Sequence, residues 1–275
     1  MRQFALVLLL LLGFGATPMA AAPCRPVEGL EAVIEPRAIV LFGEVHGTVE
    51  APAFVANALC HALAAGHKVT LALEHPLEER ERLAAFLRSD GGAAARAALL
   101  AGPFWTGGFQ DGRSSEAMFA LIDEARRLKK AGQPLELVVF DSLAYAGDRD
   151  RDMGRTLQAA IDAAPDRLFL VLTGNLHSQL TVGREGDPAF VPMGITVKSG
   201  LADRRVVALD VSASGGEFWG CYSPTDCGPK AYGAKPKGEQ WKVSALEAEP
   251  ALRGHHGRYH VGTFHASPPQ VPKAP

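Results

Sequence analysis

Six polar side chains of types that move protons or bind metals follow directly after apolar runs of the sequence. They are Glu44, His46, Glu74, Asp141, Asn175 and His177. Two histidines with one or two carboxylates suit a divalent metal such as Zn²⁺, Mn²⁺ or Co²⁺. A bound metal would lower the pKa of a water and generate hydroxide, with the remaining carboxylate as general base. Without a metal, His46 or Glu74 could activate a water directly.

The apolar runs themselves are typical of strands buried on both faces, as in a parallel sheet. They cover residues 38–42, 69–73, 135–140, 168–172 and 205–211. Amphipathic segments between them predict helices over 52–65, 77–88, 114–130 and 151–163. An alanine-rich segment that follows Gly92 predicts a further helix that ends at Leu100. This alternation predicts an α/β fold with three layers, in which helices flank a mostly parallel sheet. After about Val211 we expect an antiparallel extension, with short strands near Phe218 and Val261.

The carboxyl ends of parallel strands lie at one edge of a sheet, and ligands of open α/β sheets bind outside that edge. We therefore expect four of the polar residues to share one catalytic site: Glu44, His46, Glu74 and His177. If a metal binds there, its expected ligands are His46, Glu74 and His177. Asp141 has an alternative role as a turn or capping residue, since polar residues commonly follow strands.

Further residues are candidates for substrate binding: Trp105, Arg113, Asp141, Arg151 and Asn175. Trp105 falls in a segment rich in glycine and aromatics, 102–112, which we expect to be a loop that lines the pocket. Arg113 and Arg151 either bind an anionic substrate group or orient Glu44 and Glu74. The alternative for both arginines is a surface salt bridge.

Four motifs in order resemble one superfamily, that of erythromycin esterases, ChaN-type haem-binding proteins and Tiki/TraB proteases. Gly43-Glu44-Val45-His46-Gly47-Thr48 is similar to its Gly-Glu-x-His opening. Glu74 ends the second predicted strand, Arg151-Asp152-x-Gly opens a later helix, and Gly174-Asn175-Leu176-His177 follows a strand. The likeness covers about residues 39–177, and the four motifs together are more specific than the first alone.

The resemblance implies an α/β fold with its site at the strand ends, but three different activities. Esterase-like members hydrolyse a lactone without an essential metal, using residues that correspond to Glu44, His46 and Glu74. Tiki-like members are metal-dependent proteases with paired Gly-x-x-His motifs, and residues 43–46 and 174–177 both fit that pattern. ChaN-like members bind haem through a tyrosine. The candidates here, none of them in a recognised motif, are Tyr145, Tyr222, Tyr232 and Tyr259.

We therefore expect a hydrolase that cleaves an ester or amide bond of a small molecule or peptide. The alternatives are a haem- or iron-binding protein and a non-catalytic member of the superfamily. No Gly-x-Ser-x-Gly elbow and no phosphate-binding loop support a serine hydrolase or a P-loop enzyme. The formal net charge is −2 and no basic stripe is present, so we expect no nucleic-acid partner.

The first 22 residues have the order of a secretory signal peptide: Arg2, an apolar run over 4–14, then Ala20, Ala21 and Ala22. The alternatives are an uncleaved anchor and a lipoprotein cleaved before Cys24, against which Pro23 argues. We expect a periplasmic or secreted protein with no stable membrane span after cleavage. One domain over 23–266 and a Pro-rich, disordered tail over 267–275 complete the expected organisation.

Four cysteines in an exported chain favour disulfides. Three pairings are possible, and we prefer Cys24 with Cys60 and Cys221 with Cys227, because the second pair brackets a turn-rich stretch. A cysteine metal site is less favoured, since the sequence contains no Cys-x-x-Cys.

Overall fold

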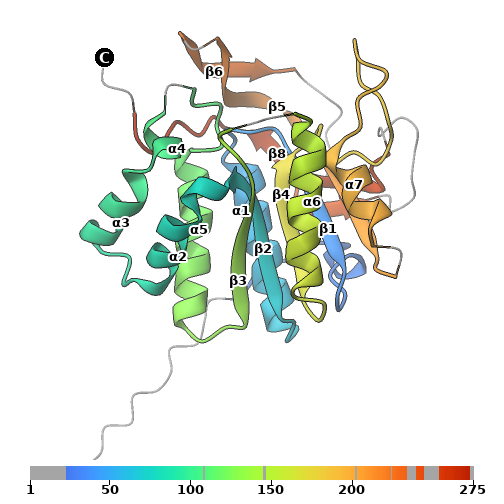
Figure 1. Ribbon diagram of the computed structural model, residues 1–275, viewed down its shortest axis with the longest axis horizontal. Helices are drawn as coiled ribbons and strands as arrows, with labels where there is room; N and C mark the ends of the chain where they lie inside the picture. Colours follow the sequence, from blue (N-terminus) through green and yellow to red (C-terminus); the bar gives the residue numbers. More distant parts are fainter. Residues whose placement is uncertain are drawn as a thin grey trace, which may run out of the picture.

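The computed structural model describes residues 23–107, 109–144, 147–201, 203–223, 225–233, 240–244 and 254–272. The expected signal peptide and Tyr145 lie outside the described residues. Within these ranges the chain forms one sheet of eight strands with helices on both faces (Figure 1). The strands are β1 (Ile39–Glu44), β2 (Val69–Pro76), β3 (Leu135–Asp141), β4 (Leu168–Gly174), β5 (Val206–Ser223), β6 (Asp226–Tyr232), β7 (Lys242–Ser244) and β8 (Gly257–Phe264).

The helices connect these strands or cover them. The α-helices are α1 (Glu50–Ala64), α2 (Arg80–Arg88), α3 (Ala93–Leu100), α4 (Pro103–Thr106), α5 (Glu116–Lys130), α6 (Arg149–Asp162) and α7 (Met193–Ser199). Two short 3₁₀ turns, η1 (Leu30–Ala32) and η2 (Leu77–Glu79), precede β1 and α2. Ser115 caps α5 by accepting a hydrogen bond from the Met118 amide, and basic residues in the last turn complement the helix dipole.

The strand order is β3-β2-β4-β1-β5-β8-β7, and β6 pairs with β5 beside this path. Neighbouring strands from β3 to β8 are parallel, whereas β6 and β7 pair antiparallel with β5 and β8. The expected mostly parallel sheet with an antiparallel extension is therefore confirmed. In this order the carboxyl ends of β1, β2, β3 and β4 lie next to one another at one edge.

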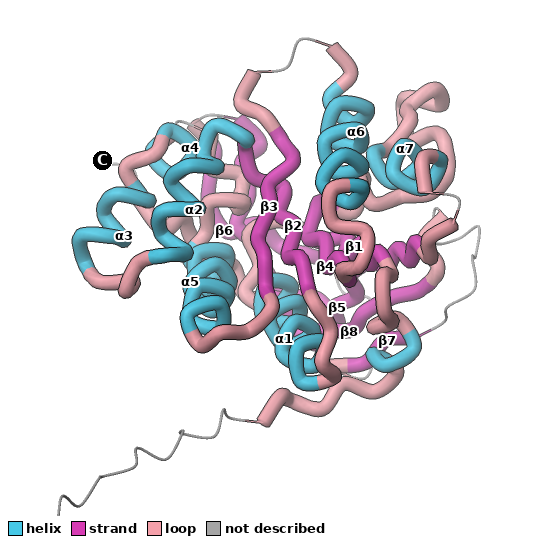
Figure 2. The backbone as a smooth tube through the Cα atoms, turned by 60° about the horizontal axis from the view of Figure 1, so that its bottom comes forward, coloured by secondary structure: helices cyan, strands magenta, loops and turns pink. Residues whose placement is uncertain are grey.

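Two apolar layers explain the continuous hydrophobic runs of the central strands. Val40 and Phe42 pack with α1, α2 and α5, whereas Ile39 and Leu41 pack with α6 and α7 on the opposite face. Successive side chains of a strand point to opposite faces, so a strand covered on both sides needs apolar residues at every position. Figure 2 shows the sheet between these two groups of helices.

Three segments differ from the sequence-based expectation. β5 runs on to Ser223, well beyond the expected end at Val211, and includes Phe218. The expected loop over 102–112 contains the short helix α4. The expected disorder of the tail is wrong for residues 267–272: Gln110 Nε2 donates to the Val271 carbonyl, and Ser115 and Pro269 form a β-bridge. Backbone pairing thus holds a Pro-rich segment that composition alone would leave disordered.

Both expected disulfides are present. Cys24 joins Cys60 of α1, and Cys221 joins Cys227 across the β5–β6 hairpin. Disulfides persist in oxidising compartments, so this pairing indicates an environment outside the reducing cytosol. Among the residues that the structure describes, no helix is both long and apolar enough to span a bilayer.

Candidate functional site

The ends of β1, β2 and β4 bring the four expected catalytic residues together. Glu44 is the last residue of β1, and its register partner in β4 is Gly174, three residues before His177. The β2–β3 register shifts between Leu73 and Pro76, so Glu74 lies at an irregularity of the kind that re-aims side chains near active sites. The Nε2 atoms of His46 and His177 each lie 3.7 Å from the same Glu74 oxygen, Oε1.

Glu74 is buried and fully engaged. Its Oε2 accepts hydrogen bonds of 2.7 Å from both the Thr173 hydroxyl and the Gly174 amide. Its Oε1 lies 2.7 Å from Arg149 Nη2 and 3.4 Å from Arg113 Nη1. Burial alone would raise the pKa of Glu74, but the neighbouring histidine and arginine charges hold it well below its usual value. A carboxylate stabilised in this way is a poor proton acceptor and a good anchor for the cations around it.

Glu44 orients His46. His46 Nδ1–H donates to Glu44 Oε1 over 3.0 Å, which turns Nε2 toward the pocket. Burial opposes the charge on His46, but the Glu74 charge and the Glu44 hydrogen bond raise its pKa to about 10. Burial raises the pKa of Glu44. Because unfolding would return His46 to a pKa near 6.5, its contribution to stability is complete below about pH 6.5 and is lost as the pH rises through about 10.

Asp150 orients His177 in the same manner. Asp150 Oδ1 lies 2.7 Å from His177 Nδ1 and also accepts the Met193 amide at 2.9 Å. Arg149 Nη1 lies 2.9 Å from His177 Nε2. Because a guanidinium can only donate, this contact assigns the lone pair to Nε2 and the proton to Nδ1. His177 thus presents Nε2 to the Arg149 guanidinium as an acceptor at the pocket.

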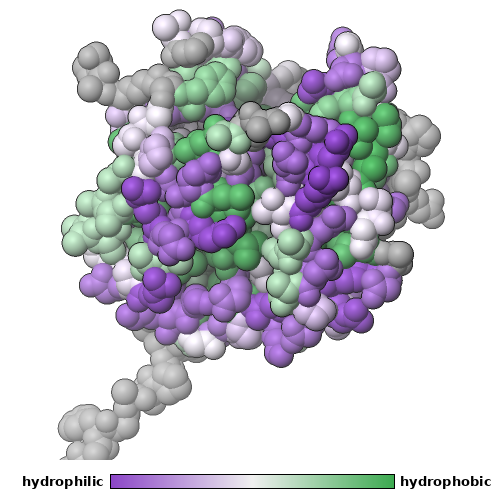
Figure 3. Space-filling model, viewed as in Figure 1, coloured by the Kyte–Doolittle hydropathy of each residue, from purple (hydrophilic) through white to green (hydrophobic). Residues whose placement is uncertain are grey.

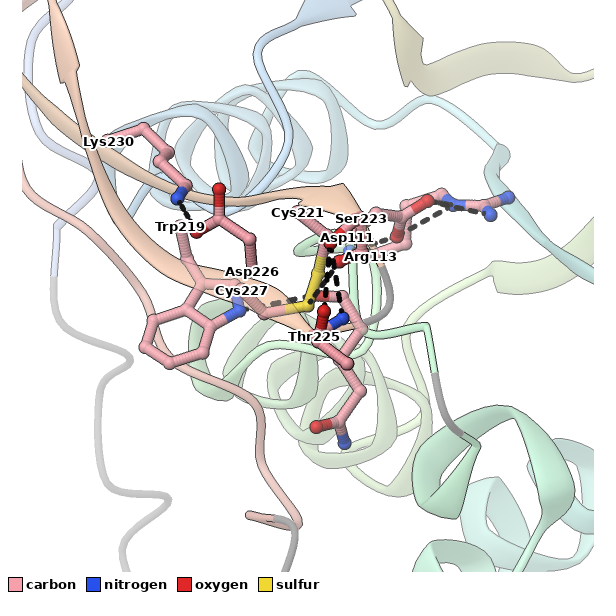
Figure 4. The surroundings of a disulfide bond; sticks show 10 residues. Asp111, Arg113, Trp219, Cys221, Ser223, Thr225, Asp226, Cys227 and Lys230 are labelled. Atoms are coloured by element: carbon pink, nitrogen blue, oxygen red, sulfur yellow. Dashed lines mark hydrogen bonds and ion pairs between the residues drawn. A yellow bond between two sulfur atoms is a disulfide. The ribbon is translucent and has the colours of Figure 1, made fainter.

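Arg113 and Asp141 extend the same network. Arg113 Nη1 lies 2.6 Å from Asp141 Oδ2, and Arg149 Nη2 lies 2.7 Å from that oxygen. Arg113 also forms an ion pair of 2.9 Å with Asp111, two residues before it in the chain. Figure 4 shows Asp111 and Arg113 beside the Cys221–Cys227 disulfide. The two arginines thus hold Glu74 and Asp141 together, which favours the orienting role for Arg113 over a surface salt bridge.

These groups surround a pocket of about 360 Å³. Its lining includes all four expected catalytic residues, Asn175, and part of the β5–β6 hairpin. A Cβ on Gly174 would come within 3.0 Å of His46 Nε2 and 3.3 Å of His177 Cδ2. A glycine at this position therefore keeps the space between the two imidazoles open to a substrate.

Two of the expected substrate-binding residues lie elsewhere. Trp105 is 0% exposed and packs in the core against His75, Phe104 and Phe119, so the prediction that it lines the pocket is wrong. Its segment folds as α4, which turns the ring inward. Arg151 is an exposed residue of α6 that pairs with Asp148, as in its alternative role as a surface salt bridge. Asn175 does line the pocket, and its Nδ2 donates to Asp210 Oδ1 over 3.2 Å.

Sequence reasoning missed Arg149, Asp150 and Asp111. The expected helix began at Arg151, which left the first two outside it. The Asp148 side chain caps the helix by accepting the Arg151 amide, so α6 begins at Arg149 and presents its first turn to the strand ends. An aspartate three residues before the expected first residue is a helix-start signal that could have located them. Asp111 carries no comparable signal in its glycine-rich segment.

A divalent metal does not fit this donor set well. Metal ligands lie about 2.0–2.2 Å from zinc, in a space between the donors that must be free of other cations. Here the Arg149 guanidinium already contacts two of the expected donors, Glu74 Oε1 at 2.7 Å and His177 Nε2 at 2.9 Å. Among the described residues, no group of three or more His, Cys, Asp or Glu is arranged to hold a metal ion. The positive charge of the site comes from Arg113, Arg149 and His46.

The described tyrosines offer little support for a haem-binding site. Tyr259 is buried and donates its hydroxyl proton to the Gly43 carbonyl. Tyr232 packs against Phe264. Tyr222 reaches the pocket, but the walls there carry Glu44, Glu74, Asp111, Arg113 and Arg149 rather than the apolar faces that suit a large macrocycle.

A larger cavity, of about 930 Å³, lies away from the strand ends, along β3 between α2 and α6. Hydrophobic surface over β3 with hydrophilic side chains around it is visible in Figure 3. Its lining is apolar and basic, and it contains one carboxylate, Glu136, which pairs with Lys129. The residues that line this cavity include no pair suited to acid–base catalysis, so the smaller pocket is the candidate active site.

Comparison with known proteins supports the fold. No family model and no curated protein matches the chain. The structure is similar to a mutant of the erythromycin esterase EreC in its open conformation (TM-score 0.62, 14% identity, 86% of this chain and 93% of that chain). It is also similar to a succinoglycan biosynthesis protein, with a TM-score of 0.63 and 10% identity over 91% of this chain and 95% of that chain. A Bacillus cereus protein is similar with a TM-score of 0.59 and 9% identity over 88% of this chain and 92% of that chain. The resemblance to the esterase superfamily is confirmed as a likeness of fold.

Proposed function

We propose that this protein is an exported hydrolase that cleaves an ester or amide bond with a water activated by histidine, without a metal. One observation carries the proposal: two imidazoles, each held at Nδ1 by its own carboxylate, present Nε2 to one pocket around a single buried glutamate. The neighbour named as an erythromycin esterase makes lactone and ester bonds the first to test. The disulfides and the predicted signal peptide favour the periplasm or the extracellular space.

The environments of the two histidines differ, and that difference assigns their roles. The contact with Arg149 marks His177 Nε2 as an acceptor, so His177 takes a proton from water, whose oxygen attacks the carbonyl carbon. The attacking water replaces Arg149 Nη1 at this nitrogen. His46 is charged and donates its Nε2 proton to the leaving oxygen or nitrogen as the bond to carbon breaks. Arg149, released toward the pocket, stabilises the developing oxyanion.

Ester hydrolysis by a His46→Gln variant tests this assignment. A general acid matters for a poor leaving group such as ethoxide and little for p-nitrophenoxide. We expect kcat for ethyl acetate to fall by roughly 10²- to 10³-fold, with a much smaller loss for p-nitrophenyl acetate. In the wild type, the rate with ethyl acetate should persist on the alkaline side until about pH 10, where His46 loses its proton.

Both rates can be followed in a pH-stat and by absorbance. The partly exposed His67 offers a matched control, because it follows the C-terminal end of α1 and lies outside the pocket lining. Equal losses for the two esters, or a rate that rises steadily to pH 10, would contradict the role of His46 as the general acid.

A further inference from the structure

The β5–β6 hairpin presents one continuous face to the candidate active site. It pairs in register from Gly216 with Tyr232 to Cys221 with Cys227, and, after a register shift at Tyr222, Ser223 pairs with Asp226. Phe218 and Gly220 share a face because side chains alternate along a strand, and both line the pocket together with Tyr222. In Figure 1 the hairpin stands above the strand ends, at the side of the sheet where the catalytic groups converge.

This face carries aromatic surface that the fold leaves uncovered. Tyr222 is 75% exposed, and Leu176, which also lines the pocket, is 37% exposed. Phe218 is partly exposed at the same pocket. Large apolar side chains that gather at the rim of a polar pocket are typical of ligand-binding grooves.

Two glycines pair across the hairpin beside the Phe218 ring. Gly220 pairs with Gly228 across the hairpin. A Cβ on Gly220 would lie 2.8 Å from Phe218 Cε2, so the absence of a side chain lets the Phe218 ring lie across the strand. At Gly228 no other atom lies within 4 Å of a Cβ position. The Phe218 ring therefore covers Gly220, whereas the space over Gly228 is open.

The hairpin is held in place at several points. The Cys221–Cys227 disulfide closes it, and Cys221 Sγ contacts the Gln110 carbonyl oxygen at 3.2 Å. The Trp219 indole N–H donates to the same oxygen over 3.0 Å (Figure 4). Lys230 Nζ lies 4.5 Å from the Tyr222 ring centroid, which supports that ring from one side. A surface fixed in advance binds with a smaller entropic loss.

We propose that the hairpin is a substrate subsite that stacks a flat, apolar ring group of the molecule to be cleaved, with Tyr222 and Phe218 as the stacking residues. The identity of the cleaved bond rests on the proposed function, whereas the stacking itself does not. The substrate class is thus an ester or amide with an aromatic or similarly flat ring near the scissile bond. Short aliphatic esters fit the catalytic pocket but gain no binding affinity from the hairpin.

Two probes separate stacking from catalysis. The first is 2-naphthalenemethanol, whose affinity is measured by fluorescence titration and needs no turnover. The second is the ratio of kcat/KM for 2-naphthylmethyl acetate to kcat/KM for ethyl acetate. We expect Tyr222→Ala to lower both the affinity and the ratio by about 3- to 10-fold, the range of an aromatic stacking contact. Tyr222→Phe, which retains the ring, should restore both.

Val182→Ala is the matched control, because Val182 is 59% exposed and lies outside the pocket lining. The double variant Cys221→Ser/Cys227→Ser should lower the ratio as well, and Cys24→Ser/Cys60→Ser should not. Ethyl acetate turnover with an unchanged ratio and affinity in Tyr222→Ala would overturn the subsite while leaving the proposed function intact. No turnover of either ester, with naphthalenemethanol binding lost in Tyr222→Ala, would overturn the proposed function and support the subsite.

Discussion

Replacing Glu74 with glutamine should lower kcat for ester hydrolysis by roughly 10³-fold and destabilise the fold by about 3 kcal/mol. Its carboxylate is the common partner of Arg149, Arg113 and the Nε2 atoms of both histidines. Glutamine has the same shape but no charge, so the cations lose part of their neutralisation while they remain buried. His46 and His177 then lose the negative charge that both of their Nε2 atoms face.

The measurement combines pH-stat kinetics with urea unfolding of the same preparations. Glu81→Gln is a suitable control, because Glu81 is an exposed glutamate of the neighbouring helix α2. Activity of Glu74→Gln close to that of the control would show that Glu74 does not organise the site. Loss of activity without any loss of stability would mean that Glu74 acts directly on the substrate rather than through its neighbours.

Replacing Asp150 with asparagine should lower kcat by roughly 10³- to 10⁴-fold with a smaller loss of stability. Asp150 accepts a hydrogen bond from His177 Nδ1–H and thereby fixes the tautomer that leaves Nε2 as an acceptor. An asparagine amide can donate to Nδ1 instead, which moves the imidazole proton to Nε2 and removes the base. The Met193 amide donates to the same oxygen, Oδ1, so an amide nitrogen in that position would also leave this N–H without its acceptor.

Asp152→Asn is the matched control on the same helix, since Asp152 is exposed and outside the pocket lining. The tautomer can be followed directly by the ¹⁵N chemical shifts of His177. A large loss of activity together with an unchanged tautomer would contradict the role given to Asp150. Retained activity would exclude His177 as the base.

The strand ends were predictable because a strand buried on both faces leaves an unmistakable apolar run. The runs ending at Phe42, Leu73 and Leu172 located Glu44, His46, Glu74 and His177, which the structure brings into one pocket. The same reasoning could not place residues whose position depends on where a helix begins. The start of α6 at Arg149, two residues before the expected one, brings Arg149 and Asp150 to the site in place of Arg151.

The remaining differences come from tertiary pairing that leaves no local pattern. Trp105 was expected at the pocket because of its neighbouring glycines, but α4 directs it into an aromatic cluster of the core. The length of β5 follows from its pairing with β6 and β8, which lie farther along the chain. The pairing of the tail with Ser115 depends on a helix more than a hundred residues away.

The most direct test of metal-independent catalysis is ethyl acetate turnover by untagged protein whose metal content is measured after treatment with a strong chelator. We expect kcat/KM to stay the same as zinc, manganese and cobalt fall to trace levels, because arginine supplies the positive charge beside Glu74 and His177. The His46→Gln variant should show the same roughly 10²- to 10³-fold loss toward this ester before and after chelation. Loss of turnover on chelation, restored by one equivalent of a divalent metal, would contradict the proposed mechanism and favour the metal-dependent alternative.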